Sequence, residues 1–337
     1  MLADDGKSKF SMKNMLIDIA PIGLSTYARP QHLQQTIEAL QKNILAPQSE
    51  LYAFSDAPKT GDEERVAAVR SYLRTITGFK KVHIIERESN GRVANSRGGI
   101  QDLVDRFGRV IFLAEDIVTA PGFLTFMNEA LNKYEENDRV FSVSGYCPPI
   151  RIPENYNHDI FFLRRFSGWG FGIWKNRFDR LEYMTPEEYE QFATNKNKVK
   201  DFVKAGGEDL MVMLKADAYG QIDAGDVKLM YAQFLSDQYT VYPTRSLVQN
   251  IGHDGTGTHC GNSDGFNVVL SNKTTFLLPD DVVVDQRIVK ANWKFRESLR
   301  DERSLIQKIV ALAVKWLELR VCKRYLKSYA SRLMQSK

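Results

Sequence analysis

The chain has 337 residues, of which 43% are hydrophobic and 26% charged, a composition typical of a globular protein with a large core. No stretch reaches the roughly 18 apolar residues that a membrane-spanning helix needs, and the polar residues 1–14 do not have the pattern of a signal peptide. The net charge is +4, but residues 303–337 alone carry +8, so the rest of the chain is acidic at −4, which excludes a uniformly basic nucleic-acid binder.

The hydrophobic pattern predicts strands and helices in alternation. The first strand candidate is Leu16–Leu24, which Pro21 interrupts because proline cannot donate to a sheet. The further predicted strands are 51–54, 81–85, 110–114 and 140–145, and the predicted helices are 31–42, 62–76 and 93–107. Such alternation indicates βαβ units and an α/β fold with a mostly parallel sheet flanked by helices.

Polar clusters follow four of these strands, at Ser25/Thr26, Asp56, Asn90/Gly91 and Glu115/Asp116. In an open α/β sheet, ligands bind outside the carboxyl ends of the strands, so the clusters predict a nucleotide-binding face. The sequence contains neither a dinucleotide-binding fingerprint nor a phosphate-binding glycine loop with lysine.

Two adjacent carboxylates, Glu115 and Asp116, end the most apolar of these strands, 110–114. An unpaired carboxylate is costly to bury, so these acids do not serve the core. They could hold Mg2+ or Mn2+, which prefer carboxylate oxygens and share their other positions with substrate phosphates. The alternative is a pair of solvated acids in a loop.

The order of these segments resembles the GT-A (Rossmann-like) fold of nucleotide-sugar glycosyltransferases over roughly Ile17–Asn262, and more narrowly the inverting family 2 and N-acetylglucosaminyltransferase I types. Ser25-Thr-Tyr-Ala-Arg-Pro30 is similar to the family's Pro-Thr-Tyr-Asn-Arg-Pro opening, and Asn90-Gly-Arg-Val-Ala-Asn95 to its Asn-x-Gly element. Leu113-Ala-Glu-Asp-Ile117 is similar to Leu-Asp-Asp-Asp-Ile, with Ala114 in place of the first acid.

The resemblance assigns roles to these residues. It implies that Asp116 holds the metal, and that the nucleotide sugar is bound by residues from all four clusters. These residues are Ser25, Thr26, Tyr27, Arg29, Asp56, Asn90, Gly91 and Glu115.

The segment Ser167-Gly-Trp-Gly-Phe-Gly172 is similar to the family's loop lining the sugar and acceptor pocket. Gly168 and Gly170 would let the backbone approach a ligand closely, and Trp169 offers an apolar face suited to a sugar ring. The alternative for Trp169 and Trp174 is packing in the core.

The segment Gly206-Gly-Glu-Asp-Leu-Met211 closely resembles the element that supplies the catalytic base, which would be Asp209 or Glu208. A carboxylate acting as a base near neutral pH is expected to have a raised pKa. The alternative is that either acid caps the helix that the apolar run 210–214 begins.

The segment 246–260 resembles an Asn-Ile-Gly-x-Asp-Gly-x-Gly-Thr-His motif of a bacterial subgroup. The resemblance implies that His259 contacts the metal or the diphosphate, with His253 as a weaker candidate. A histidine in a loop can also be simply solvated.

The reaction implied is an inverting, Mn2+- or Mg2+-dependent transfer of a sugar from a nucleotide diphosphate sugar, a UDP-sugar by preference, to a hydroxyl of a glycan or lipid-linked acceptor in surface polysaccharide synthesis. Two alternatives stay open. One is a non-catalytic relative that binds carbohydrate or nucleotide sugar, which the departure at Ala114 suggests. The other is a sugar nucleotidyltransferase, which the lack of a glycine-rich opening loop disfavours.

The predicted organisation is an N-terminal tail 1–14, a catalytic domain 15–265 with a nucleotide-binding half 15–120 and an acceptor half 121–265, an extension 266–302, and a basic helix 303–337. A basic amphipathic helix with Trp316 on its apolar face can lie on an anionic membrane, or it can pack on the core. Three scattered cysteines favour a reducing compartment, so the expected location is the cytoplasm, with peripheral attachment to the inner face of the membrane. No nucleic-acid partner is expected.

Overall fold

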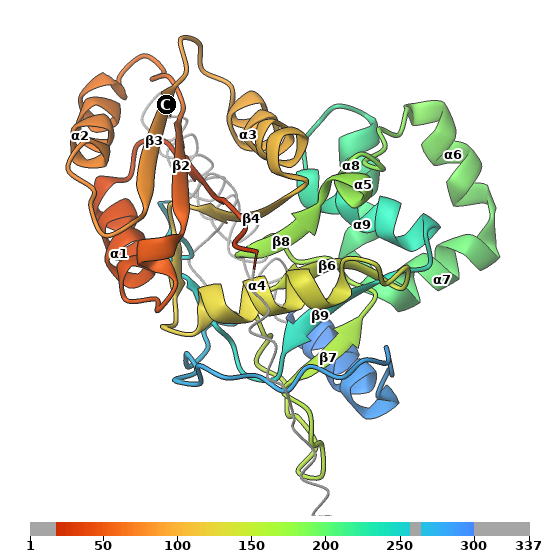
Figure 1. The fold of residues 1–337 in the computed structure, drawn as a ribbon. Helices are drawn as coiled ribbons and strands as arrows, with labels where there is room; N and C mark the ends of the chain where they lie inside the picture. The colour runs from red at the N-terminus through yellow and green to blue at the C-terminus, as the bar shows by residue number, and fades with distance from the viewer. Residues whose placement is uncertain (1–17, 257–263, 300–337) are drawn as a thin grey trace, which may run out of the picture.

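The protein is described here by a computed structural model, which places residues 18–256 and 264–299. An eight-stranded sheet in the order β3-β2-β1-β4-β8-β6-β9-β7 carries helices on both faces (Figure 1). The strands are β1 Ile22–Thr26, β2 Glu50–Ser55, β3 Lys81–Glu86, β4 Arg109–Ala114, β6 Val140–Ser144, β7 Ile160–Leu163, β8 Phe171–Trp174 and β9 Tyr239–Pro243; a separate pair is formed by β5 Ile117–Thr119 and β10 Val248–Asn250. The predicted α/β class is confirmed.

The helices are α1 Pro30–Gln41, α2 Glu63–Leu73, α3 Arg92–Phe107, α4 Phe123–Tyr134, α5 Lys175–Phe178, α6 Pro186–Thr194, α7 Lys196–Gly206, α8 Asp209–Ala218 and α9 Gly225–Leu235, with a 3-10 turn at Ala46–Gln48. They divide into two layers, because their buried faces belong to two different core clusters. Buried residues of α1, α2 and α4 pack on one face of the sheet, and those of α3 and of α5 to α9 pack in the second cluster. None of the described helices is both long and apolar enough to cross a bilayer.

The first strand is shorter than the sequence predicts. The expected strand Leu16–Leu24 is wrong at its start, since β1 begins at Ile22, directly after Pro21. Pro21 has no N–H to donate and contributes only its carbonyl oxygen, which accepts from Ile111 N at 3.0 Å. The predicted loop Ser167–Gly172 also ends differently, because its last residues, from Phe171, belong to β8.

The order of the strands reverses at β1. Strands β1, β2 and β3 pair in parallel, while β4 pairs in parallel with the other side of β1. From β1 the chain continues to β2 in one direction along the sheet, and from β4 it continues to β6 in the other direction. The strand order therefore reverses between β1 and β4, which creates a topological switch point between their carboxyl ends. Beyond β4 the sheet is mixed, since β8 runs antiparallel to both β4 and β6.

The extension after the sheet packs on the same core. Tyr134 donates its hydroxyl to Pro279 O at 2.6 Å, and Arg139 donates to Val282 O at 2.8 Å. Residues 286–299 then form a helix whose Ile288 is buried. The predicted basic helix 303–337 lies outside the described residues.

Candidate active site

One arginine joins the loops that follow β1 and β4. Arg29 Nε lies 2.8 Å from Glu115 Oε1, and its Nη2 lies 2.8 Å from Asp116 Oδ2. The other oxygen of Glu115 accepts from the backbone N–H of Tyr27 at 2.6 Å. Glu115 is buried, and this burial raises its pKa. The predicted acid pair is therefore held by the β1 loop, and the alternative of two solvated loop acids is wrong.

Asp116 faces a glycine from the far end of the domain. Ile251 N donates to Asp116 O at 2.9 Å, and β10 pairs antiparallel with β5, which follows Asp116 directly. A Cβ atom on Gly252 would lie 2.2 Å from Asp116 Oδ2 and 3.0 Å from Arg29 Nη1. Any larger residue at this position would displace the Asp116 carboxylate. Arg29 Nη1 is buried and has no hydrogen-bond partner among the described residues, so the site holds an unused cationic donor.

Asp56 joins the loop after β2 to the loop after β3 by hydrogen bonds. Its Oδ1 accepts from Gly91 N at 2.9 Å, and its Oδ2 accepts from Asn90 Nδ2 at 3.3 Å. Asn90 also donates to Ala57 O at 2.7 Å. The structure therefore brings together two of the predicted polar clusters, Asp56 and Asn90/Gly91.

The residues of the β1 loop are tied to neighbouring elements. Ser25 Oγ accepts from Asn95 Nδ2 at 3.2 Å, and Thr26 Oγ1 donates to Phe54 O at 3.3 Å. The hydroxyl of Tyr27 bonds to Asp62, just before α2. Hydrogen bonds to α3, to β2 and to the start of α2 therefore hold the conformation of this loop.

Trp169 lies at the centre of an aromatic cluster. Its ring centroid is 4.7 Å from that of Tyr146, 5.3 Å from that of His253 and 5.4 Å from that of Phe266. These contacts support the packing alternative while leaving Trp169 partly exposed. Trp174, in contrast, is buried and donates to Leu131 O at 3.2 Å, so its role is packing.

Gly170 is fixed by its backbone. It has a φ of +58°, which favours glycine, and a Cβ there would lie 2.9 Å from Val248. Gly170 O accepts from Gly145 N at 2.7 Å. Its neighbour Gly168 instead faces a carboxylate, because a Cβ on Gly168 would lie 2.5 Å from Asp226 Oδ1.

Asp209 is bound on both oxygens by one guanidinium. Arg165 Nη1 lies 3.0 Å from Asp209 Oδ1, and Nη2 lies 2.7 Å from Oδ2. Burial acts to raise the pKa of Asp209, but the charge and hydrogen bonds of Arg165, together with the charge of Arg296, outweigh it and the pKa is lowered. The expected raised pKa is therefore wrong for Asp209. Glu208, its neighbour, has an exposed side chain.

Asp226, at the start of α9, has the property expected of the base and was missed in the sequence. Burial raises its pKa, against the opposing charges of Arg165 and Arg92. Its side chain is exposed to solvent on one side and lies against Gly168 on the other, where a Cβ would be 2.5 Å from Asp226 Oδ1. The signal was present, since Gly225-Asp226 opens α9 as Glu208-Asp209 opens α8.

The described residues contain no group of three His, Cys, Asp or Glu side chains that could hold a metal by themselves. Asp116 offers a carboxylate at the end of a strand, and a divalent cation can be held by one such carboxylate together with substrate phosphates. The residues therefore fit a metal bound jointly with a diphosphate. The ring of His253 packs against both Trp169 and Phe266, and His259 lies outside the described residues.

The search against models of known protein families found no match, and neither did the search of curated proteins. Among solved structures, the chain is similar to residues 1–349 of TarS from S. aureus, at 11% identity and a TM-score of 0.40, over 70% of this chain and 62% of that one. A longer TarS structure matches at 11% identity with a TM-score of 0.38, over 68% of this chain and 36% of that chain, so this chain spans less than two thirds of both TarS structures.

The mannosyltransferase PcManGT from Pyrobaculum calidifontis, solved with GDP-Man and Mn2+, matches at 12% identity with a TM-score of 0.36, over 65% of this chain and 72% of that one. These values describe a distant likeness in fold.

Proposed function

We propose that the protein is an inverting glycosyltransferase that moves a sugar from a nucleotide diphosphate sugar, a UDP-sugar by preference, to a hydroxyl of a glycan or lipid-linked acceptor. The observation that carries the proposal is the arrangement at the switch point between β1 and β4. There, Asp116 and the unpartnered Nη1 of Arg29 lie together opposite Gly252. A carboxylate for a cation and a free guanidinium N–H for a phosphate oxygen are the groups that a metal diphosphate needs.

The nucleoside would bind beside the diphosphate, along the loops after β1, β2 and β3. The hydrogen bonds of Asp56 to Asn90 and Gly91 support this placement, because they join the loops after β2 and β3 at the same edge of the sheet. A bound Mn2+ or Mg2+ would neutralise the charge that develops on the leaving diphosphate. Asp116 would hold that cation, and His259 is a further proposed ligand.

We assign the catalytic base to Asp226 in preference to Asp209. In a single displacement, the acceptor oxygen bonds to the anomeric carbon, the bond to the diphosphate breaks, and the base takes the acceptor proton. A raised pKa makes Asp226 the stronger base of the two, while the bidentate contact with Arg165 occupies both oxygens of Asp209. Asp209 would then act as a positioning residue for Arg165.

The proposal extends to the biological setting through the sequence resemblance alone. The acceptor would belong to surface polysaccharide synthesis, and the enzyme would act in the cytoplasm with the segment 303–337 at the inner face of the membrane. The non-catalytic relative remains the second candidate, because Ala114 replaces an acid of the family's motif.

The decisive experiment measures donor binding and turnover together. A panel of nucleotide sugars with Mn2+ is screened for a rise in melting temperature, because a ligand that binds only the folded state raises apparent stability. The stabilising donor is then incubated with the enzyme, and release of free nucleoside diphosphate is followed. If the wild type releases nucleoside diphosphate and the Asp226→Asn variant does not, the protein is an enzyme. If the wild type binds the nucleotide sugar but releases no nucleoside diphosphate, the non-catalytic relative is favoured.

A further inference from the structure

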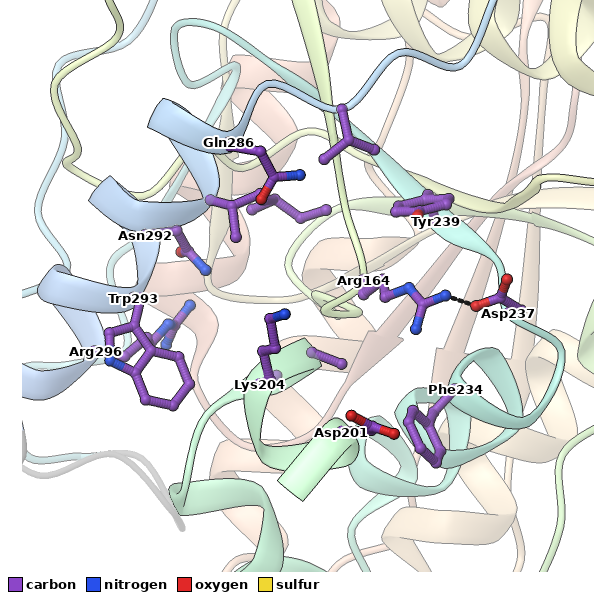
Figure 2. A pocket seen from close by; sticks show the side chains of 15 residues that line it. Arg164, Asp201, Lys204, Phe234, Asp237, Tyr239, Gln286, Asn292, Trp293 and Arg296 are labelled. Carbon is purple, nitrogen blue, oxygen red and sulfur yellow. Dashed lines mark ion pairs between the residues drawn. The ribbon is translucent and has the colours of Figure 1, made fainter. Parts of the chain in front are cut away.

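A pocket of about 430 Å³ lies behind the segment that carries Asp209. Its walls come from α7, from the ends of β7 and β9, and from the helix 286–299 (Figure 2). Gly206 contributes to the pocket wall and its carbonyl oxygen accepts from Arg165, the residue that binds Asp209. Arg165 therefore connects the wall of the pocket to Asp209.

The pocket carries a positive charge that its own walls do not cancel. Arg164 and Asp237 neutralise each other in a direct ion pair (Figure 2). The remaining charged groups are Lys204, Arg296 and Asp201, which sum to one positive charge. Neither Lys204 nor Arg296 forms an ion pair within residues 18–256 and 264–299. Asp209, outside the lining of the pocket, attracts Arg296 only as a neighbouring charge.

Two side chains of the helix 286–299 present polar atoms that lack partners. Asn292 is only 8% exposed, and its Oδ1 makes no hydrogen bond within the described chain. Arg296 Nε is buried and equally without a hydrogen-bond partner in that part of the protein. Burial and then repulsion from Arg165 lower the pKa of Arg296 to about 10. Buried polar groups are normally satisfied, so these atoms indicate a ligand that is polar and brings negative charge.

The rest of the lining has the composition of a carbohydrate site. Trp293 supplies an aromatic face that is partly open, and Figure 2 shows Trp293 and Lys204 on the same side of the pocket. Gln286 and Asn292 supply amide groups that can bond sugar hydroxyls. A pocket of this size falls in the range that holds small ligands.

We propose that this pocket is an acceptor subsite that binds a negatively charged sugar residue, carrying either a carboxylate or a phosphate, with Lys204 and Arg296 as its charge partners and Trp293 as its platform. The inference rests on the proposed function, since it names the acceptor class for that active site. It also specifies the chemistry: a charged sugar held here would direct a neighbouring hydroxyl of the same acceptor toward the active site.

The test is a ligand-observed NMR titration of the full chain with three probes: methyl glucuronide, glucose 6-phosphate and the neutral methyl glucoside. We expect the charged probes to bind at least about tenfold more tightly than the glucoside, because a hydrogen bond to a charged group contributes about 1.5–3 kcal/mol. The preference should weaken with added salt. The tighter of the two charged probes identifies the carboxylate or the phosphate as the ligand group.

The variant Lys204→Gln removes one charge from an exposed side chain and should lower affinity for the charged probe about tenfold or more. The matched control is Lys200→Gln, one turn earlier on α7 and outside this pocket, which should bind as the wild type does. Equal binding of charged and neutral probes, or equal loss in both variants, overturns the inference. Donor binding is measured in parallel: its presence in wild type and Lys204→Gln keeps the proposed function standing even when the subsite fails, and its absence from the wild type contradicts the function itself.

Discussion

Replacing Gly252 by alanine tests whether the Arg29–Asp116 pair is the centre of the donor site. The added Cβ would lie 2.2 Å from Asp116 Oδ2, and real Cβ atoms essentially never come closer to a neighbour than 3.0 Å. Gly252 cannot easily retreat, because its N–H donates to Asn250 Oδ1 at 2.7 Å and Ile251 N is bonded to Asp116 O. The carboxylate of Asp116 must therefore rotate away from Arg29.

The expected cost is that of one charge-assisted hydrogen bond in a buried place, about 1.5–3 kcal/mol. For a domain of this size, such a loss lowers the melting temperature by on the order of 5 °C. Because the same carboxylate is the proposed metal ligand, the dissociation constant for UDP with Mn2+ should rise about tenfold or more. Thermal melting and isothermal calorimetry measure the two effects.

The control is Gly225→Ala, where a Cβ meets nothing within 4 Å and alanine favours the helix. Its melting temperature should stay unchanged or rise slightly. Arg29→Met, made alone and together with Gly252→Ala, completes a double-mutant cycle. Additive effects of the two changes, or a Gly252→Ala variant with normal stability and UDP affinity, would refute the steric argument.

Four other outcomes are expected. Asp116→Asn should abolish Mn2+-dependent UDP binding in calorimetry while the circular dichroism spectrum stays native. Asp226→Asn should lower transfer by about 10²–10⁴-fold with donor affinity unchanged, measured as kcat against Kd. The base must be deprotonated and the pKa of Asp226 is raised, so wild-type kcat should begin to fall on acidification at a pH above 3.8, the ordinary pKa of an aspartate. A fall that begins only below pH 3.8 would instead point to Asp209, whose pKa is lowered. Removal of 303–337 should abolish sedimentation with anionic vesicles but preserve transfer to a soluble acceptor, and a full-length protein that ignores vesicles would contradict the membrane proposal.

Hydrophobic periodicity was sufficient to predict the first half of the fold. Strands there are short apolar runs between amphipathic helices, so β2, β3 and β4 fall within one or two residues of their predicted positions. In the second half β6 was also predicted, but β7 and β8 were not, because these four-residue strands follow loops of mixed character. Local pattern also could not reveal that β8 inserts antiparallel between β4 and β6, since that depends on pairing over long distances.

The site shows the same division. Residues that follow strands, such as Asp56 and Asp116, were predicted as site candidates from their position, and their roles came from the family resemblance. Arg165 and Asp226 were missed because their importance arises from partners far away in the chain, at Asp209 and Gly168. The pKa of a carboxylate is set by these partners and by burial. The sequence therefore predicted a raised pKa where that of Asp209 is lowered, and it did not point to the raised pKa of Asp226.

The small pair of strands β5 and β10 has a consequence for how the protein can move. Register places Asn250 opposite Ile117, so the backbone next to Asp116 and the backbone next to Gly252 are joined by main-chain hydrogen bonds across some 130 positions of sequence. The two segments must therefore shift as one body, and their spacing does not depend on which side chains they carry. Amide hydrogens in this ladder should exchange slowly with solvent even in the ligand-free protein. Any closure over a bound donor then has its hinge outside the ladder, and the floor of the site stays rigid while other parts of it adjust.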